Sequence, residues 1–324
     1  MEGNNHYNYY ALQFIPDNKD IYTASEFAKG NLQWNGKNTW KSWHLIPSSR
    51  PVINPPTIKA NYIDIPGGNG TIDASSILTD YPVYNDREGQ IEYYVTRNYP
   101  KYDSWTRVYH EVLNYLGGKT FKVILEEEPS YYYRGRVNVN QWKSEKDWSK
   151  ITLDYHLEPF KYEVLSSTEP WLWDPFSFVD GIITPEQKVY PGEDPRTIYD
   201  NFVISGSNRE HITVRNYNDG NPIYGAKMEI TPGTAPFSPS FSIRCDTNIV
   251  SGNHTWMHVL QVRQYSNHLE KISETELKFT DNTMMTKRFY DMTFYEKDYD
   301  EFIFFETPAN YQFTVTVNFR RGWL

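Results

Sequence analysis

Residues 58–78 read IKANYIDIPGGNGTIDASSIL. The first part alternates as a β-strand does, with Ile58 in one set of side chains and Ile63 in the other. Pro66 then removes a backbone donor, and Gly67-Gly68-Asn69-Gly70 tolerates positive φ angles. A second short apolar pattern follows at once. The stretch therefore predicts a strand, a tight turn and a second element, which alone is typical of any β-rich domain.

The composition favours strands. The chain of 324 residues contains 27 Tyr, 17 Phe and 10 Trp, and these aromatic residues make up 17% of it. Such enrichment, with frequent Gly, Pro and Asn between apolar segments, is typical of β-rich proteins. The net charge of −9 weighs against stable nucleic-acid binding, because proteins that bind the phosphate backbone usually carry a basic face.

The sequence also indicates the cellular compartment in which the protein folds. There is one cysteine, Cys245, so no intrachain disulfide can form. The N-terminal sequence MEGNNHYNYY lacks the basic and apolar regions of a signal peptide. No window approaches the roughly 18 consecutive apolar residues of a membrane span. We expect a soluble protein that folds in a reducing cytoplasm, without membrane insertion and with Cys245 in a core.

One amphipathic helix is predicted over residues 104–116. Asp103 or Ser104 can cap its start, and Gly117-Gly118 ends it in a left-handed conformation. The apolar side chains form a single stripe, which predicts packing on a sheet: Trp105, Val108, Tyr109, Val112, Leu113 and Leu116. We expect Leu113→Ala to cost about 2–5 kcal/mol.

The segments around this helix have the alternation and punctuation of antiparallel strands. Before the helix we predict a polar turn at residues 85–89 and a strand at residues 90–97. After the helix we predict a strand at residues 120–125 and a charged turn at residues 126–130. Residues 131–142 and 150–157 are predicted to form a hairpin, with Gly135 at a bulge or a close approach. Prolines between residues 47 and 56 favour an extended path there.

A polar linker between about residues 164 and 174 divides the chain, so we predict domains at 1–165 and 166–324. From residue 202 onward, short strands recur at spacings of about 8–12 residues between turn signals. The predicted strands are residues 201–205, 211–217, 224–231, 241–246, 255–262, 301–305 and 311–324. This pattern predicts an antiparallel sandwich or jelly roll in the second half.

No pattern predicts catalysis, a cofactor or a metal site. His254 and His258 have the spacing of zinc ligands on a helix, but Thr255 stands where a zinc protease needs Glu, and the segment favours a strand. The acidic runs at 126–128 and 298–300 are typical of solvated turns rather than of a catalytic carboxylate pair. We therefore predict that the protein is not an enzyme.

A series of segments is more specific. In order, the chain has TWKSWHLIPSSRPVINPPTIKANYIDIPGGNGTIDAS, a strand, a Trp-led helix ending in LGGK, a strand, YYYRGRV and a strand ending in LEPF. This series, from about Thr39 to Phe160, resembles the phage distal tail protein family of long non-contractile and prophage tails that infect Gram-positive bacteria. The terminal FRRGWL is similar to the end of family members.

The resemblance implies a fold and a role. The fold is an N-terminal β-sandwich with one α-helix and a protruding β-hairpin, followed by a C-terminal galectin-like antiparallel β-sandwich. The role is a hexameric ring at the virion tail tip, assembled in the host cytoplasm. The ring would join the major tail tube protein to the tail-associated hub protein and to receptor-binding proteins, and would let DNA pass.

The ring contacts expected from these motifs are Arg87, Tyr131, Tyr132, Tyr133, Arg134, Gly135 and Arg136. The turn at Pro66, Gly67, Gly68, Gly70 and Asp73 is expected to fix an edge of the sheet. Two other functions stay open. The aromatic clusters, among them Trp171 and Trp173, are compatible with a carbohydrate-binding adhesin, and a cell-wall hydrolase is the third hypothesis.

Overall fold

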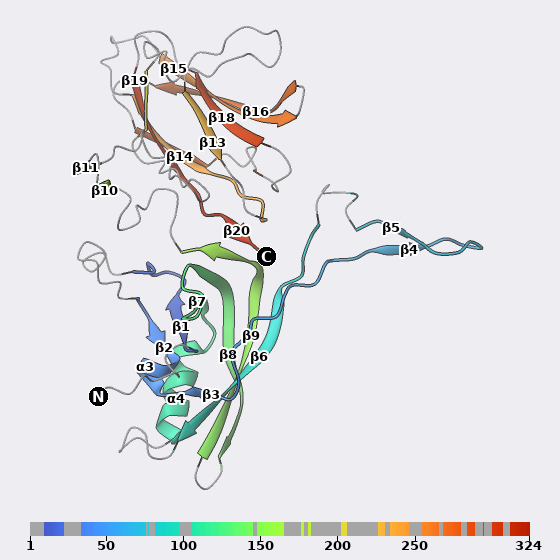
Figure 1. Cartoon of the computed structure of the whole chain (residues 1–324), viewed down its shortest axis with the longest axis vertical. Helices are drawn as coiled ribbons and strands as arrows, with labels where there is room; N and C mark the ends of the chain where they lie inside the picture. The colour runs from blue at the N-terminus through green and yellow to red at the C-terminus, as the bar shows by residue number, and fades with distance from the viewer. Residues whose placement is uncertain are drawn as a thin grey trace. The chain divides into compact units, whose positions relative to one another are not determined.

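The computed structural model describes residues 10–22, 34–75, 77, 82–96, 105–144, 148–164, 176–177, 181–182, 202–205, 226–230, 234–245, 255–265, 268–279, 284–288, 294, 300–306 and 312–324. The chain divides into two compact units, residues 1–164 with Leu324 and residues 165–323. Both are built of antiparallel strands, so the protein is mainly β, as predicted (Figure 1). No helix in these ranges is long and apolar enough to cross a bilayer.

The first unit is built around one antiparallel sheet in the order β2–β1–β7–β8–β9–β6–β3, with a separate pair β4–β5. Its elements are β1 (Leu12–Pro16), β2 (Lys37–Asn38), α3 (Thr39–Trp43), β3 (Ile46–Pro47), β4 (Tyr62–Asp64), β5 (Thr71–Asp73), β6 (Arg87–Thr96), α4 (Trp105–Leu116), β7 (Thr120–Leu125), β8 (Tyr131–Ser144) and β9 (Trp148–Glu163).

The predicted amphipathic helix is confirmed as α4. It ends where expected, because the Gly117 N–H donates to the Leu113 carbonyl and Gly118 adopts a φ of 72°. Val108, Val112 and Leu116 are buried against the sheet. The choice of Leu113 as a core residue was wrong. Its side chain is half-buried beside the stripe, so Val112 is the position where truncation leaves a cavity.

The β8–β9 hairpin is confirmed and is longer than predicted. Its register shifts between Tyr133 and Gly135, where a Cβ would meet the His156 carbonyl oxygen at 2.3 Å. Glycine is therefore required by the close approach of β9. The predicted polar turn at 85–89 is wrong in its second half, because β6 already pairs with β9 from Arg87 onward.

The core of the first unit lies between one face of the sheet and α4. Strands β1, β6, β7, β8 and β9 all contribute to it, and Phe14, Trp43, Tyr93 and Phe121 are fully buried there. A smaller core that includes Ile15, Ile124 and Tyr132 lies apart from it. Alternate residues of β1, β7 and β8 therefore enter different cores, which fixes the register of the sheet.

The short helix α3 was not predicted. Asn38 caps it, since its Oδ1 accepts from the Trp40 and Lys41 N–H groups, and His44 ends it at a φ of 53°. The prolines that favour an extended path begin only at Pro47, after the helix has ended. A single helical turn carries too few residues for periodicity to reveal it.

The second unit contains a β-sandwich. One sheet has the order β12–β19–β14–β17, the other β13–β18–β15–β16, and β10 pairs with β11. The strands are β10 (Phe176–Ser177), β11 (Gly181–Ile182), β12 (Phe202–Ser205), β13 (Ala226–Ile230), β14 (Ser240–Cys245), β15 (Thr255–Tyr265), β16 (His268–Phe279), β17 (Met284–Arg288), β18 (Asp300–Glu306), β19 (Gln312–Asn318) and β20 (Gly322–Trp323).

Both sheets of this sandwich contribute to one core. Phe241 and Val315 enter it from one sheet, Val259 and Ile303 from the other, and Cys245 is buried among them as predicted. The strands β16 and β17 were not predicted. The strand expected at residues 211–217 lies outside the described residues.

Candidate functional site

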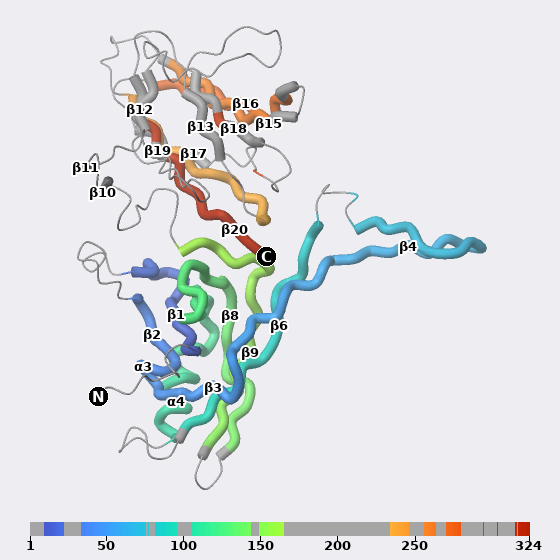
Figure 2. Tube along the Cα trace, in the orientation of Figure 1, coloured from blue at the N-terminus to red at the C-terminus, as the bar shows by residue number. Residues whose placement is uncertain are grey.

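A two-stranded arm leaves the main sheet of the first unit between β3 and β6 (Figures 1 and 2). We call residues 57–75, 77 and 82–85 the arm. At its base the Asn85 N–H donates to the Thr57 carbonyl at 2.8 Å and the Lys59 N–H to the Val83 carbonyl at 2.7 Å. Further out, β4 pairs with β5, and Ile63 lies opposite Ile72.

The turn of the arm is the glycine run seen in the sequence. Gly67 and Gly70 have φ angles of 75° and 84°, and a Cβ at Gly68 would lie 2.9 Å from the Ile65 side chain. Asp73 accepts a hydrogen bond from the Ser75 N–H at 2.9 Å, and its interactions with Ser75 lower the pKa of its carboxyl. Because β4 and β5 form a sheet of their own, this turn lies at the end of the arm and not at an edge of the main sheet.

The two faces of the arm differ: one carries paired isoleucines, and the other carries two carboxylates beside Tyr62, which is 62% exposed. Ile63 and Ile72 pair across the strands and are 51% and 53% exposed. The other face carries the pairs Tyr62–Asp73 and Asp64–Thr71. Further exposed apolar side chains on the arm are Ile58, Ile65 and Ile77. Contiguous exposed apolar surface is typical of sites that bind another protein, among other roles.

Arg87 anchors the base of the arm. It is the first residue of β6 and only 4% exposed. Its Nε donates to the Pro159 carbonyl at 2.8 Å and its Nη1 to the Asn54 carbonyl at 3.0 Å, while the guanidinium lies over the Tyr133 ring. Burial lowers the pKa of Arg87, although an arginine stays charged at neutral pH. Arg87 therefore ties the segment before the arm to β9.

Asn54 and Tyr155 complete this anchor. The Asn54 N–H donates to the Tyr155 Oη at 2.9 Å, and its Nδ2 donates to the Glu88 carbonyl at 2.8 Å. The Tyr155 Oη donates in turn to the Val52 carbonyl at 3.4 Å. Burial raises the pKa of Tyr155, so the phenol keeps its proton. A Cβ at Gly89 would lie 2.2 Å from the Tyr155 Oη, so a larger residue there would displace the Tyr155 side chain from this anchor.

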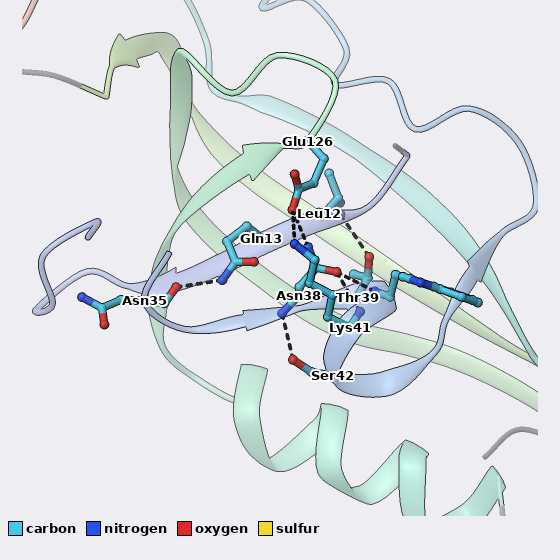
Figure 3. Close-up of polar contacts among 9 residues, drawn as sticks. Leu12, Gln13, Asn35, Asn38, Thr39, Lys41, Ser42 and Glu126 are labelled. Atoms are coloured by element: carbon cyan, nitrogen blue, oxygen red, sulfur yellow. Dashed lines mark hydrogen bonds and ion pairs between the residues drawn. The ribbon is translucent and has the colours of Figure 1, made fainter. Parts of the chain in front are cut away.

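The turn after β7 holds α3 in place (Figure 3). The Glu126 Oε1 accepts from the Asn38 Nδ2 at 2.9 Å and lies 3.6 Å from the Lys41 Nζ. Thr39 adds a second link, since its Oγ1 accepts from the Leu12 N–H at 3.0 Å. The helix that precedes the arm segment is thus tied to β1 and β7.

The other two glutamates of this turn bind two further segments. Glu127 forms a two-pronged ion pair with Arg50, which lies between β3 and the arm. Glu128 accepts from the Lys161 Nζ on β9 at 2.5 Å. The expectation that residues 126–128 form a merely solvated acidic turn was therefore wrong, because each carboxylate has its own cation.

The predicted contact residues on β8 divide into two groups. Tyr132 and Tyr133 are each 7% exposed and lie in different cores of the first unit. Arg134 binds both carboxylate oxygens of Asp17, at 2.8 and 2.9 Å, and Glu158 at 2.6 Å. The hydrogen bond from Arg134 lowers the pKa of Asp17. These side chains hold the unit itself together.

Tyr131 and Arg136 are more accessible. Arg136 is exposed, and its Nη1 donates to the Gly118 carbonyl at 3.2 Å. Tyr131 is half-buried, with the Lys161 Nζ 4.6 Å from its ring centre. The bulge at Gly135 separates the two positions along β8.

The sequence analysis missed a cluster of three aromatic rings at the far end of β8. The Trp142 ring lies 4.3 Å from Trp105 and 4.9 Å from Tyr109, centre to centre, and both partners come from the first turns of α4. Trp142 is 39% exposed. We call these three residues the Trp142 cluster. Part of the cluster could have been predicted from the sequence, because Trp105 and Tyr109 are four residues apart on one helix. Their contact with Trp142 on β8 could not, because it joins segments that are distant in the sequence.

No group of three or more His, Cys, Asp or Glu side chains is placed to hold a metal ion within the described ranges. His258 lies on a strand, as predicted, and its ring nitrogens contact Glu274 at 3.2 Å and Glu276 at 3.0 Å. His254, Asp298 and the Trp171–Trp173 segment lie outside the described residues.

No protein-family model and no curated protein matches the sequence. Among solved structures, the chain is similar to a crystal structure of SPP1 Dit, described as a paradigm of the hub adsorption apparatus in phages that infect Gram-positive bacteria. The match covers 97% of this chain and 99% of that chain, with 11% sequence identity and a TM-score of 0.49. At this identity and TM-score the likeness assigns neither a family nor an activity to the chain.

Proposed function

We propose that this protein is a structural component of a phage tail tip and assembles with copies of itself into a ring. The observation that carries the proposal is the arm, because its apolar face is uncovered in the single chain. An isolated two-stranded hairpin is marginally stable in water. Burial of its apolar face in an assembly would stabilise the hairpin and remove this surface from solvent.

The segments that resemble distal tail proteins support the proposal, since they build one unit. They form α3 and the arm at residues 39–75, and then α4, β7, β8 and β9. This arrangement suits a ring-forming domain that ends near residue 165, followed by a galectin-like sandwich domain.

In this proposal the ring has six copies at the virion tail tip. It joins the major tail tube protein to the tail-associated hub protein and to receptor-binding proteins, and DNA passes through it. A net charge of −9 suits a passage that does not hold DNA by its phosphates. Tyr131 and Arg136 remain candidate ring contacts, because their side chains are accessible.

Native mass spectrometry with negative-stain imaging of the purified protein tests the proposal. We expect six-subunit rings with a central hole. A variant in which two glycines replace residues 61–75 should fold, as judged by circular dichroism, and stay monomeric. Asn69→Ser in the turn is the matched control and should form rings. A wild-type chain that stays monomeric at high concentration, or an armless variant that forms the same rings, would contradict the proposal.

A further inference from the structure

The uncovered apolar surfaces of the first unit fall into two groups. The larger group lies on the arm, where Ile63 and Ile72 form the centre of one face. Outside the arm, the exposed large apolar side chains among the described residues are Val52, Trp142 and Leu324. Of these three, Trp142 is the aromatic residue, and its ring packs against two other aromatic rings.

We infer that the apolar face of the arm binds the Trp142 cluster of a second copy of this chain. The inference rests on the proposed self-assembly and adds which surface receives the arm. A partly exposed tryptophan packed against two other aromatic rings is typical of the central contacts of protein interfaces, where Trp and Tyr are enriched. Branched aliphatic side chains such as Ile63 and Ile72 offer the matching apolar surface.

An arm cannot reach the cluster of its own chain. The arm joins β6 at Arg87, whereas Trp142 pairs with Ile151, which lies opposite Tyr93 of β6. From Arg87 to Tyr93 the strand covers about 20 Å. The arm leaves the sheet in the other direction (Figure 1). A contact between these two surfaces therefore requires a second copy.

The length of the arm suits such a contact. From Thr57 to the turn at Gly67, a paired strand spans about 30 Å, which is enough to cross the face of a neighbouring domain of this size.

The symmetry of this contact has a consequence. The arm and the Trp142 cluster are different surfaces, so each copy uses one of each with two different neighbours. Contacts of this heterologous kind form closed rings or open filaments rather than simple two-fold dimers. If the repeated contact closes on itself, the resulting assembly is a ring.

Site-specific photo-cross-linking tests the inference on the full chain. A photo-reactive residue is introduced at Ile63, and isotope-labelled and unlabelled copies are mixed before illumination. We expect cross-links between differently labelled copies that map to the peptides containing Trp142 or Trp105. The same residue at Tyr62, on the opposite face of the arm, is the matched control and should label these peptides weakly.

A second measurement concerns affinity. Loss of a central aromatic contact weakens association about thirtyfold or more, so Trp142→Ala should raise the dissociation constant by that factor. Trp40→Ala, a half-buried aromatic on α3, should leave it unchanged. Amide hydrogen exchange of β8 in the monomer establishes that Trp142→Ala is folded.

The outcomes separate the two proposals. Rings that form with no Ile63 cross-link to these peptides, or that tolerate Trp142→Ala, overturn this inference and leave the structural role standing. A chain that does not self-associate overturns both. Cross-links to Trp142 only within one copy also overturn the inference.

Discussion

Replacement of Arg87 by Met distinguishes a ring contact from an internal anchor. The sequence motifs favour Arg87 as a contact between copies, yet the structure buries it to 4% exposure at the base of the arm. Arg87→Met keeps most of the side-chain volume and removes the guanidinium. It leaves the carbonyl groups of Pro159 and Asn54 without their donors, and Tyr133 without its cation.

The magnitude follows from these contacts. Each hydrogen bond from a charged donor is worth about 1.5–3 kcal/mol. Removal of a buried charge also relieves its desolvation cost, which offsets part of the loss. We expect the free energy of unfolding of the first unit to fall by about 2–4 kcal/mol.

Amide hydrogen exchange is the suitable assay because it reports each unit separately, whereas a two-unit chain need not unfold in one step. Protection of the β6 and β9 amides should fall in Arg87→Met, while that of β14 and β15 in the second unit stays unchanged. Arg136→Met, at an exposed position, should change protection by less than about 0.5 kcal/mol. A change that small for Arg87→Met would refute its role as an internal anchor.

Three further changes test the interior. Gly135→Ala places a Cβ against backbone 2.3 Å away and should destabilise the first unit by at least about 2 kcal/mol in urea unfolding; a neutral result would mean that β9 can move aside. Val112→Ala should cost about 1–3 kcal/mol and more than Leu113→Ala, and the reverse order would contradict the packing of α4. Asp17→Asn should cost about 1 kcal/mol at pH 7, since the ion pair with Arg134 is partly exposed. Because the folded pKa of Asp17 lies below 3.8, the difference should persist above that pH and disappear as the pH falls through the lowered pKa; a difference unchanged at pH 2 would refute it.

The elements with strong local signals were predictable. The stripe of α4 and the glycines after it fixed both the helix and its end, and the alternation of residues 120–125 matched β7. In contrast, β16 has the sequence HLEKISETELKF, in which charged residues are so frequent that no apolar alternation is visible. Its buried residues Leu277 and Phe279 were therefore not recognised as part of a strand. The helix α3 depends on one capping side chain, Asn38, which no periodicity reveals.

The candidate site was less accessible to sequence reasoning. A strand, a turn and a second strand were predicted for residues 58–78, but nothing local says whether such a hairpin joins a sheet or stands apart. The burial of Arg87 depends on Pro159 and Asn54, which are distant in the sequence. The Trp142 cluster likewise requires β8 to meet α4. Contacts between distant segments decide these features, and a single sequence does not contain them explicitly.

The position of β9 in the sheet bears on how the protein is made. Strand β9 is the last strand of the first unit to be synthesised, yet it lies in the middle of the sheet between β8 and β6. On the ribosome, β6 and β8 therefore emerge with open hydrogen-bonding edges. They stay open until residues 148–163 follow at about 5–20 residues per second. Such edges invite pairing with other chains, so a slow stretch of translation before β9 would favour aggregation of the nascent protein.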